Sequence, residues 1–187
     1  QKVQKQQSQP AGIVIIQGAA GPSASTVVGI YKLQVAKYNG RPLWCKKADD
    51  DKWLAYMSNG RWYVTSTGRK CSDDPGGWLV SIGWQLCPSE VTNWKVWTGV
   101  DWELQSSVTV RALANVPDII TISGATGPNM GIVNGIYELD IAMCNGHHVW
   151  QKRNHNQQRS DAPWLARMND GCWYVTTSKH ISSGDPR

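Results

Sequence analysis

The segment Val28-Gly29-Ile30-Tyr31-Lys32-Leu33-Gln34-Val35, followed by the pair Asn39-Gly40, indicates the fold class. Apolar and polar residues alternate in its second half, which places Tyr31 and Leu33 on one face, as in a half-buried strand. Asn-Gly is the strongest short signal for a β-hairpin, because both residues tolerate positive φ. The segment therefore predicts two antiparallel strands joined by a tight turn.

The same pattern returns in the second half of the chain, where residues 118–187 retrace residues 12–76. The motif Gly29-Ile30-Tyr31 recurs as Gly135-Ile136-Tyr137, and after an insertion Trp53-Leu54-Ala55 recurs as Trp164-Leu165-Ala166. A period this long exceeds that of solenoid repeats, so each copy is expected to be a small domain with its own core.

We therefore predict an all-β chain of tandem small antiparallel modules, each a β-meander or barrel-like, because short strand patterns and turn residues alternate throughout. The second copy is expected to be incomplete, since nothing in it matches residues 77–110. The predicted division is a flexible N-terminal arm at residues 1–11, a first module at 12–110, a linker at 111–117 and a truncated second module at 118–187.

Composition excludes several classes of protein. With 41% hydrophobic and 18% charged residues, the chain has enough apolar material for packed cores. The net charge of +5 is spread along the sequence rather than gathered in one basic stripe, so we expect no nucleic-acid partner. No apolar run approaches the ~20 residues of a membrane helix, so no transmembrane segment is expected. Since no targeting segment is visible and no Met begins the chain, we expect a processed product or a fragment, and no compartment is assigned.

A resemblance adds to this interpretation. The stretch Ile120 to Pro128 followed by Asn134-Gly135-Ile136-Tyr137-Glu138, together with Asn39-Gly40-Arg41-Pro42, Gly60 to Val64 and Trp94 to Gly99, resembles a tryptophan-rich repeat of large dinoflagellate, algal and protist proteins. It covers nearly all of residues 12–187. The second copy departs from the pattern at His147-His148. The resemblance implies a module type and no activity, because such repeats have no assigned function.

The sequence offers no enzyme chemistry, and we expect no catalytic residues, no metal and no cofactor. The five cysteines do not align between the copies, which favours free thiols, with a local Cys71–Cys87 bridge as the alternative. His147, His148 and His155 lie in turn or insertion sequence, and the first copy has no His to match them, so a repeated metal site or base is not expected. The run Asp49-Asp50-Asp51 lacks the spacing of a calcium loop, and Gly18-x-x-Gly21-Pro22 is interpreted as a tight turn.

Tryptophans are the remaining candidates. Those shared by both copies are expected in the core, and Trp94 and Trp97 should point to opposite faces of one strand. The predicted core is Tyr31, Leu33, Trp53, Trp62, Val64, Tyr137, Leu139, Trp164, Trp173 and Val175. The predicted binding residues are Trp94, Trp97, Trp102, Trp78 and Trp84.

Together these features suggest a non-enzymatic protein-binding or assembly module, an accessory subunit or fragment of a larger, possibly algal, complex. Carbohydrate binding by exposed Trp faces is the alternative. The incomplete second copy is expected to leave an apolar face around Trp164, Trp173 and Val175. Either another chain or the first module covers that face, or the protein continues past Arg187.

Overall fold

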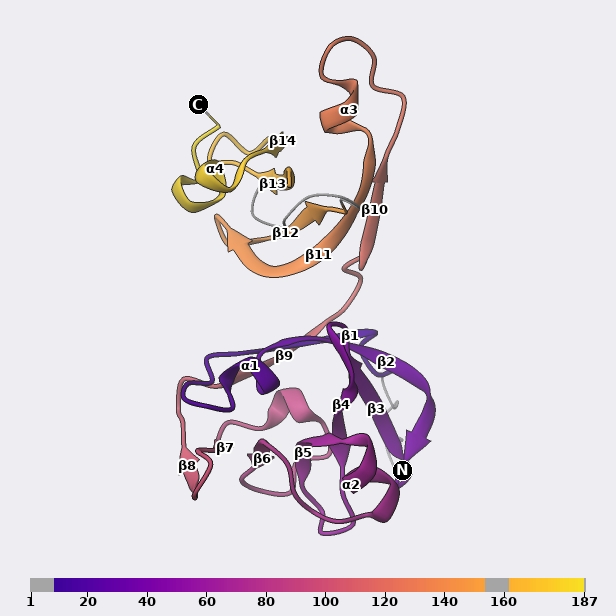
Figure 1. Ribbon diagram of the computed structural model, residues 1–187, viewed down its shortest axis with the longest axis vertical. Helices are drawn as coiled ribbons and strands as arrows, with labels where there is room; N and C mark the ends of the chain where they lie inside the picture. The colour runs from indigo at the N-terminus through magenta and orange to yellow at the C-terminus, as the bar shows by residue number, and fades with distance from the viewer. Residues whose placement is uncertain (1–8, 154–161, 187) are drawn as a thin grey trace, which may run out of the picture. The chain divides into compact units, whose positions relative to one another are not determined.

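A computed structural model describes residues 9–153 and 162–186, which form two compact units, one ending at Asn115 and the other beginning at Val116. Each unit is one curled antiparallel sheet, and the helices in both are short (Figure 1). The prediction of small, barrel-like all-β modules is therefore confirmed.

The first unit contains a nine-stranded sheet in which neighbours follow the chain order, except that β9 closes onto β1 (order β8-β7-β6-β5-β4-β3-β2-β1-β9). Short helices α1 (Ala24–Val27), α2 (Thr67–Ser72) and the 3-10 helix η1 (Pro88–Glu90) lie between strands. The strands are β1 (Ile13–Gln17), β2 (Gly29–Tyr38), β3 (Arg41–Lys46), β4 (Asp49–Tyr56), β5 (Trp62–Ser66), β6 (Leu79–Ser81), β7 (Trp94–Trp97), β8 (Trp102–Leu104) and β9 (Thr109–Leu113).

The β2–β3 hairpin forms where the sequence predicts it. Asn39 and Gly40 have φ values of 47° and 71°, as a tight turn between antiparallel strands requires. The register of the two strands shifts between Leu33 and Lys37, so β2 bends and the sheet curls. The curl brings the inward side chains of distant strands together around one core.

That core is lined by side chains from strands on every side of the curled sheet. Trp62 and Trp94 are both fully buried in it, one from β5 and the other from β7. The segment after residue 77 therefore covers the face formed by the strands before it. Its buried contributions to the core are Leu79, Val91, Trp94, Val96, Val108 and Val110.

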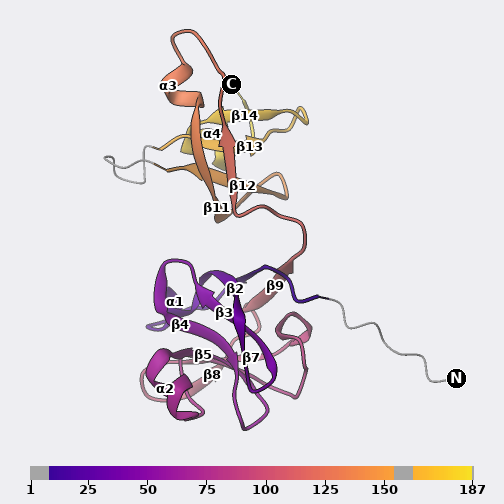
Figure 2. The ribbon, with the colours of Figure 1, turned by 90° about the vertical axis from the view of Figure 1, so that its right-hand side faces the viewer.

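The second unit contains a five-stranded sheet in which each strand has a counterpart in β1–β5 of the first (order β10-β11-β12-β13-β14). Helix α3 (Met130–Val133) follows the long loop after β10, as Figure 2 shows, and α4 (Ser178–Ser183) follows β14. The strands are β10 (Ile119–Ile122), β11 (Gly135–Cys144), β12 (His147–Lys152), β13 (Trp164–Arg167) and β14 (Trp173–Thr176).

The same side-chain hydrogen bonds hold the corresponding strands of both units. Tyr31 donates its hydroxyl to the Val27 carbonyl at 2.7 Å, and Tyr137 donates to the Val133 carbonyl at the same distance. The indole of Trp44 donates to a carbonyl of the chain before β1 at 2.9 Å, as that of Trp150 does before β10 at 2.8 Å. These bonds fix the sheet to the segments that enter it.

Two details differ from the sequence analysis. Strand β9 continues to Leu113, so residues 111–113 belong to the first sheet rather than to a linker, because they pair with β1. His147 and His148 lie in strand β12 rather than in a turn, whereas His155 lies outside the described residues. Among the residues that the structure describes, no helix is long and apolar enough to cross a membrane.

Candidate functional site

The five predicted binding tryptophans do not form one surface. Trp94 is fully buried, and its indole N–H donates to the Val91 carbonyl, so its assignment to a binding surface is wrong. Trp97, on the opposite face of β7, is only partly covered. Alternation along β7 separates these two side chains, but it does not indicate which one points into the core.

Trp84 is the most exposed of the five, with 66% of its surface accessible. Its ring lies against the Gly60 turn, and the guanidinium of Arg61 stands 5.7 Å from the ring centroid. Trp84 follows β6 in the chain and does not line the pocket described below.

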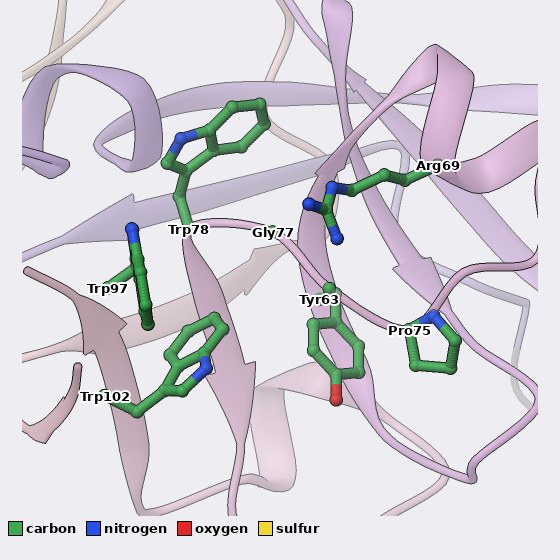
Figure 3. Close-up of a pocket in the computed structure, with 8 residues that line it drawn as sticks. Tyr63, Arg69, Pro75, Gly77, Trp78, Trp97 and Trp102 are labelled. Atoms are coloured by element: carbon green, nitrogen blue, oxygen red, sulfur yellow. The ribbon is translucent and has the colours of Figure 1, made fainter. Parts of the chain in front are cut away.

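Trp78, Trp97 and Trp102 line one pocket with a volume of about 340 Å³ (Figure 3). Trp97 and Trp102 face each other across the β7–β8 hairpin, with ring centroids 5.5 Å apart and planes tilted by 61°. The structure adds residues that the sequence analysis did not assign to a site, namely Tyr63, Arg69, Pro75, Gly76 and Gly77.

Two glycines shape the pocket wall. Gly77 has a φ of +156°, and a Cβ there would lie 2.0 Å from the carbonyl oxygen of Val64, so only glycine fits. A Cβ on Gly76 would collide with the guanidinium of Arg69. The Gly76-Gly77 pair could have signalled this close approach of the backbone, because adjacent glycines commonly mark such positions.

The pocket combines flat aromatic surfaces with cationic groups. Arg69 forms an ion pair with Asp74 at 3.0 Å, and the ammonium of Lys52 lies 4.8 Å from the ring centroid of Trp78. The pocket-lining side chains offer flat aromatic faces and a guanidinium, an arrangement that suits stacking and hydrogen bonding.

A second candidate surface lies in the second unit, where the predicted core is not covered. Trp173 is 51% exposed, although its counterpart Trp62 is fully buried, so the prediction that Trp173 is a core residue is wrong. Tyr31, Trp62, Val64, Tyr137 and Leu139 are buried as predicted. Leu33, Trp53, Trp164 and Val175 are partly covered.

The uncovered face has a physical reason. In the first unit the indole of Trp62 donates to the Gln85 carbonyl at 3.0 Å, and the buried Leu79, Trp94 and Val96 lie in the same core. Gln85, Leu79, Trp94 and Val96 all belong to the segment after residue 77, which has no match in the second unit. The face around Trp173 and Val175 is therefore apolar and accessible.

The backbone edge of β14 is open on the same side. In β5 the Trp62 N–H donates to the Ser81 hydroxyl at 3.0 Å, and the Val64 carbonyl accepts from the Trp78 N–H at 2.8 Å. The pairing of Leu165 with Val175 repeats that of Leu54 with Val64. The N–H of Trp173 and the carbonyl of Val175 therefore face the outer side of β14. On that side, no strand of the described sheet pairs with β14.

Among the residues that the structure describes, the candidate cysteine, histidine and aspartate side chains do not gather into a metal site. All five cysteines are free, and Cys144 is the only buried one, with its thiol pKa raised by burial. Within residues 9–153 and 162–186, no group of three or more His, Cys, Asp or Glu side chains is placed to hold a metal ion. Gly18 and Gly21 have φ values of 81° and 82°, as turns require.

No protein-family model, curated protein or solved structure matches this chain.

Proposed function

We propose that this chain is a non-enzymatic protein-binding and assembly module, acting as an accessory subunit or fragment of a larger complex. The observation that carries the proposal is the exposure of Trp173, 51% of whose surface is accessible on an apolar face beside an open strand edge. Tryptophan is enriched among the residues that dominate protein–protein binding, because one side chain offers a large apolar area and an N–H donor.

The open edge strengthens the argument. Unpaired strand edges with apolar side chains attract other chains, so proteins normally cover or charge them. Strand β14 reads Trp173-Tyr174-Val175-Thr176, with no charged residue and no proline. A second protein on this surface supplies the cover that β6 and β7 give to the first unit.

Affinity capture with the full chain tests this function. Unaltered protein, a Trp173→Ser variant and a Trp84→Ser variant are immobilised and exposed to a lysate of the source organism. The matched control, Trp84→Ser, also loses an exposed tryptophan, but one that belongs to the first unit. We expect one protein to be retained by the unaltered chain and by Trp84→Ser, and lost with Trp173→Ser.

The retained protein is then identified by mass spectrometry and must rebind in purified form. Capture that is equal for all three chains, or no capture at all, contradicts a protein-binding role for this face. The amide spectrum of Trp173→Ser shows whether the second unit stays folded, which an exposed position permits.

A second candidate function is carbohydrate binding, which the pocket of Trp78, Trp97 and Trp102 favours. Its volume of about 340 Å³ lies in the range of small-ligand sites, and Tyr63 adds a fourth aromatic side chain. Titration with polysaccharides tests it, with Trp102→Ala as the variant. A saturable fluorescence change that the variant loses supports glycan binding, and an unchanged spectrum contradicts it.

A further inference from the structure

The pocket of Trp78, Trp97 and Trp102 belongs to the first unit, and its aromatic wall is held in place by contacts between the rings. Besides the contact of Trp97 with Trp102, the rings of Tyr63 and Trp102 meet edge to face, with centroids 6.4 Å apart and planes at 77°. Edge-to-face pairs are favourable and hold both rings in one orientation. The aromatic wall that Figure 3 shows is therefore in place before a ligand enters.

The same wall offers hydrogen-bond donors to a ligand. Elsewhere in the first unit, indole N–H groups donate to oxygens of the protein, namely those of Trp44, Trp53, Trp62 and Trp94. For Trp78, Trp97 and Trp102, no other residue that the structure describes accepts from the indole N–H. The hydroxyl of Tyr63 accepts from the Asn59 amide at 2.9 Å, which leaves its own proton available. A ligand that carries many acceptor oxygens matches these donors.

Arg69 adds positive charge to the pocket. Among the described residues that line the pocket, it is the only charged one. It donates from Nη1 to Asp74 at 3.0 Å, which engages one of the five guanidinium N–H groups. Both side chains of this ion pair are about half exposed, at 50% and 57%, so the pair is weak and leaves further N–H groups available. The guanidinium lies against Gly76, where a Cβ would displace it, so the glycine leaves room for the cation at the pocket wall.

Aromatic faces, N–H donors and one cation together specify a class of ligand. We infer that the pocket binds a sugar acid, with a pyranose ring against the indoles of Trp97 and Trp102 and its carboxylate paired with Arg69. This inference rests on the carbohydrate-binding function proposed above as the second candidate, and it specifies the kind of sugar. The face of an indole is negatively polarised, so the C–H groups of a sugar pack on it favourably. A carboxylate matches two parallel N–H groups of a guanidinium, and a volume of about 340 Å³ suits a short oligosaccharide.

Titration of the full chain with matched pairs of sugars tests the inference. The probes are trisaccharides of galacturonate, glucuronate and mannuronate, each compared with its carboxyl-reduced form, which keeps the linkage and ring configuration but has no charge. We expect at least one acid to bind about tenfold or more tightly than its reduced form, because hydrogen bonds between ionised groups are about twice as strong as neutral ones. The indole N–H signals of Trp97 and Trp102 in the NMR spectrum should shift as the acid binds.

Two arginine variants separate the proposed ion pair from a general effect of charge. Arg69→Gln should abolish the preference for the acid and leave the affinity for the reduced sugar unchanged. The matched control is Arg61→Gln, which removes an exposed arginine of the same unit that stands near Trp84 and does not line the pocket. This control should leave both affinities unchanged. Amide spectra of the two variants show whether the first unit stays folded, which exposed positions permit.

Three results overturn the inference. They are acids that bind no more tightly than their reduced forms, a preference for the acid that Arg69→Gln retains or both arginine variants lose equally, and no binding of any trisaccharide at about 10 mM, which detects even weak association. If reduced sugars bind and Trp102→Ala abolishes their binding while the acids gain nothing, the sugar-acid inference is wrong and the carbohydrate-binding function stands. If no trisaccharide binds and polysaccharides also leave the fluorescence unchanged, both are wrong.

Discussion

Trp62 and Trp173 occupy the same position in the two units and meet the same neighbour. The rings of Trp44 and Trp62 lie 5.8 Å apart at 58°, and those of Trp150 and Trp173 have the same separation and angle. Yet Trp62 is fully buried and Trp173 is 51% exposed. The difference shows that the strands shared by both units position this tryptophan. In the first unit, the segment after residue 77 also covers it.

Comparison of the two units thus separates the strands that position this tryptophan from the segment that buries it. Strands β1–β5 and β10–β14 keep the same order, and the tyrosine and lysine contacts to the first short helix recur in both. In the second unit Asn134 bonds to Ala125, in the loop that corresponds to the one Gln105 contacts at Ala20 in the first unit. In the second unit, the strands shared with the first unit are present and the apolar side chains around Trp173 stay accessible.

The largest difference is expected in backbone protection. The Trp62 amide is bonded to Ser81 inside the sheet, so its exchange requires opening of much of the first unit. The Trp173 amide faces an open edge and should exchange nearly as fast as in an unfolded chain. We expect a ratio of about a thousandfold or more between the two, since domain stabilities are about 5 kcal/mol or higher. Hydrogen exchange followed by NMR measures this ratio, and equal rates would remove the contrast on which the proposed binding function rests.

The next largest contrast concerns truncation of the two indoles. Trp62→Ala opens a cavity in a closed core and should lower the free energy of unfolding of the first unit by about 3–5 kcal/mol. Trp173→Ala removes a half-exposed ring and should cost the second unit about 1 kcal/mol. Denaturant titration with amide signals of each unit followed separately gives both values. A loss of equal size in the two units would mean that Trp173 is covered in solution by the chain itself.

A smaller and equal effect is expected where the units agree. The ammonium of Lys46 donates to the carbonyls of Ser25 and Thr26 at 2.6 and 2.8 Å, and Lys152 makes the corresponding pair of bonds. Lys46→Met and Lys152→Met should each destabilise their own unit by about 1–3 kcal/mol, because the carbonyls lose charge-assisted bonds. The same denaturant titration measures both values. An effect in only one unit would show that this lysine does not stabilise the two units equally.

The sequence predicts the strands and turns shared by both units well, because the sequence signals for them are local. Alternation around Tyr31 and the Asn39-Gly40 turn act within a few residues, and both recur in the second copy. Burial of Trp94 and exposure of Trp173 depend instead on strands that pair from far along the chain, which alternation does not indicate. For the same reason residues 111–113 resemble a linker, although their pairing with Ile13, Val14 and Ile15 of β1 places them in the sheet. The pocket at Trp102 likewise depends on Arg69 and Gly77, which only the fold brings near.

The smallest expected contrast is a pH dependence confined to the first unit. Asp73 has a φ of 49° after α2 and accepts from the Ser58 N–H at 3.3 Å and the Tyr38 hydroxyl at 2.8 Å. Its counterpart is Gly184, with a φ of 69°, and the counterpart of Tyr38 is Cys144. The second unit therefore closes the same turn without this carboxylate.

Hydrogen bonds from Ser58 and then from Tyr38 hold the pKa of Asp73 below its ordinary value, while burial and the bond to Asp73 raise the pKa of Tyr38 to about 12. A carboxyl whose pKa is lowered on folding stabilises the protein above its unfolded pKa of about 3.9, and that contribution is lost as the pH falls through the lowered value. Tyr38 stays protonated over this range, so it remains a donor. Asp73 is partly exposed to solvent, and screening keeps the effect small.

We therefore expect the melting temperature of the first unit to fall between pH 5 and pH 2 by more in the unaltered chain than in Asp73→Gly, and that of the second unit to respond equally in both. Glycine also relieves the left-handed backbone at this position, so the variant can be as stable as the unaltered chain at pH 2. Thermal unfolding followed by NMR signals of each unit measures the difference. An identical pH response in the two chains would show that the Tyr38–Asp73 contact does not stabilise the turn and that the two units close it equally well.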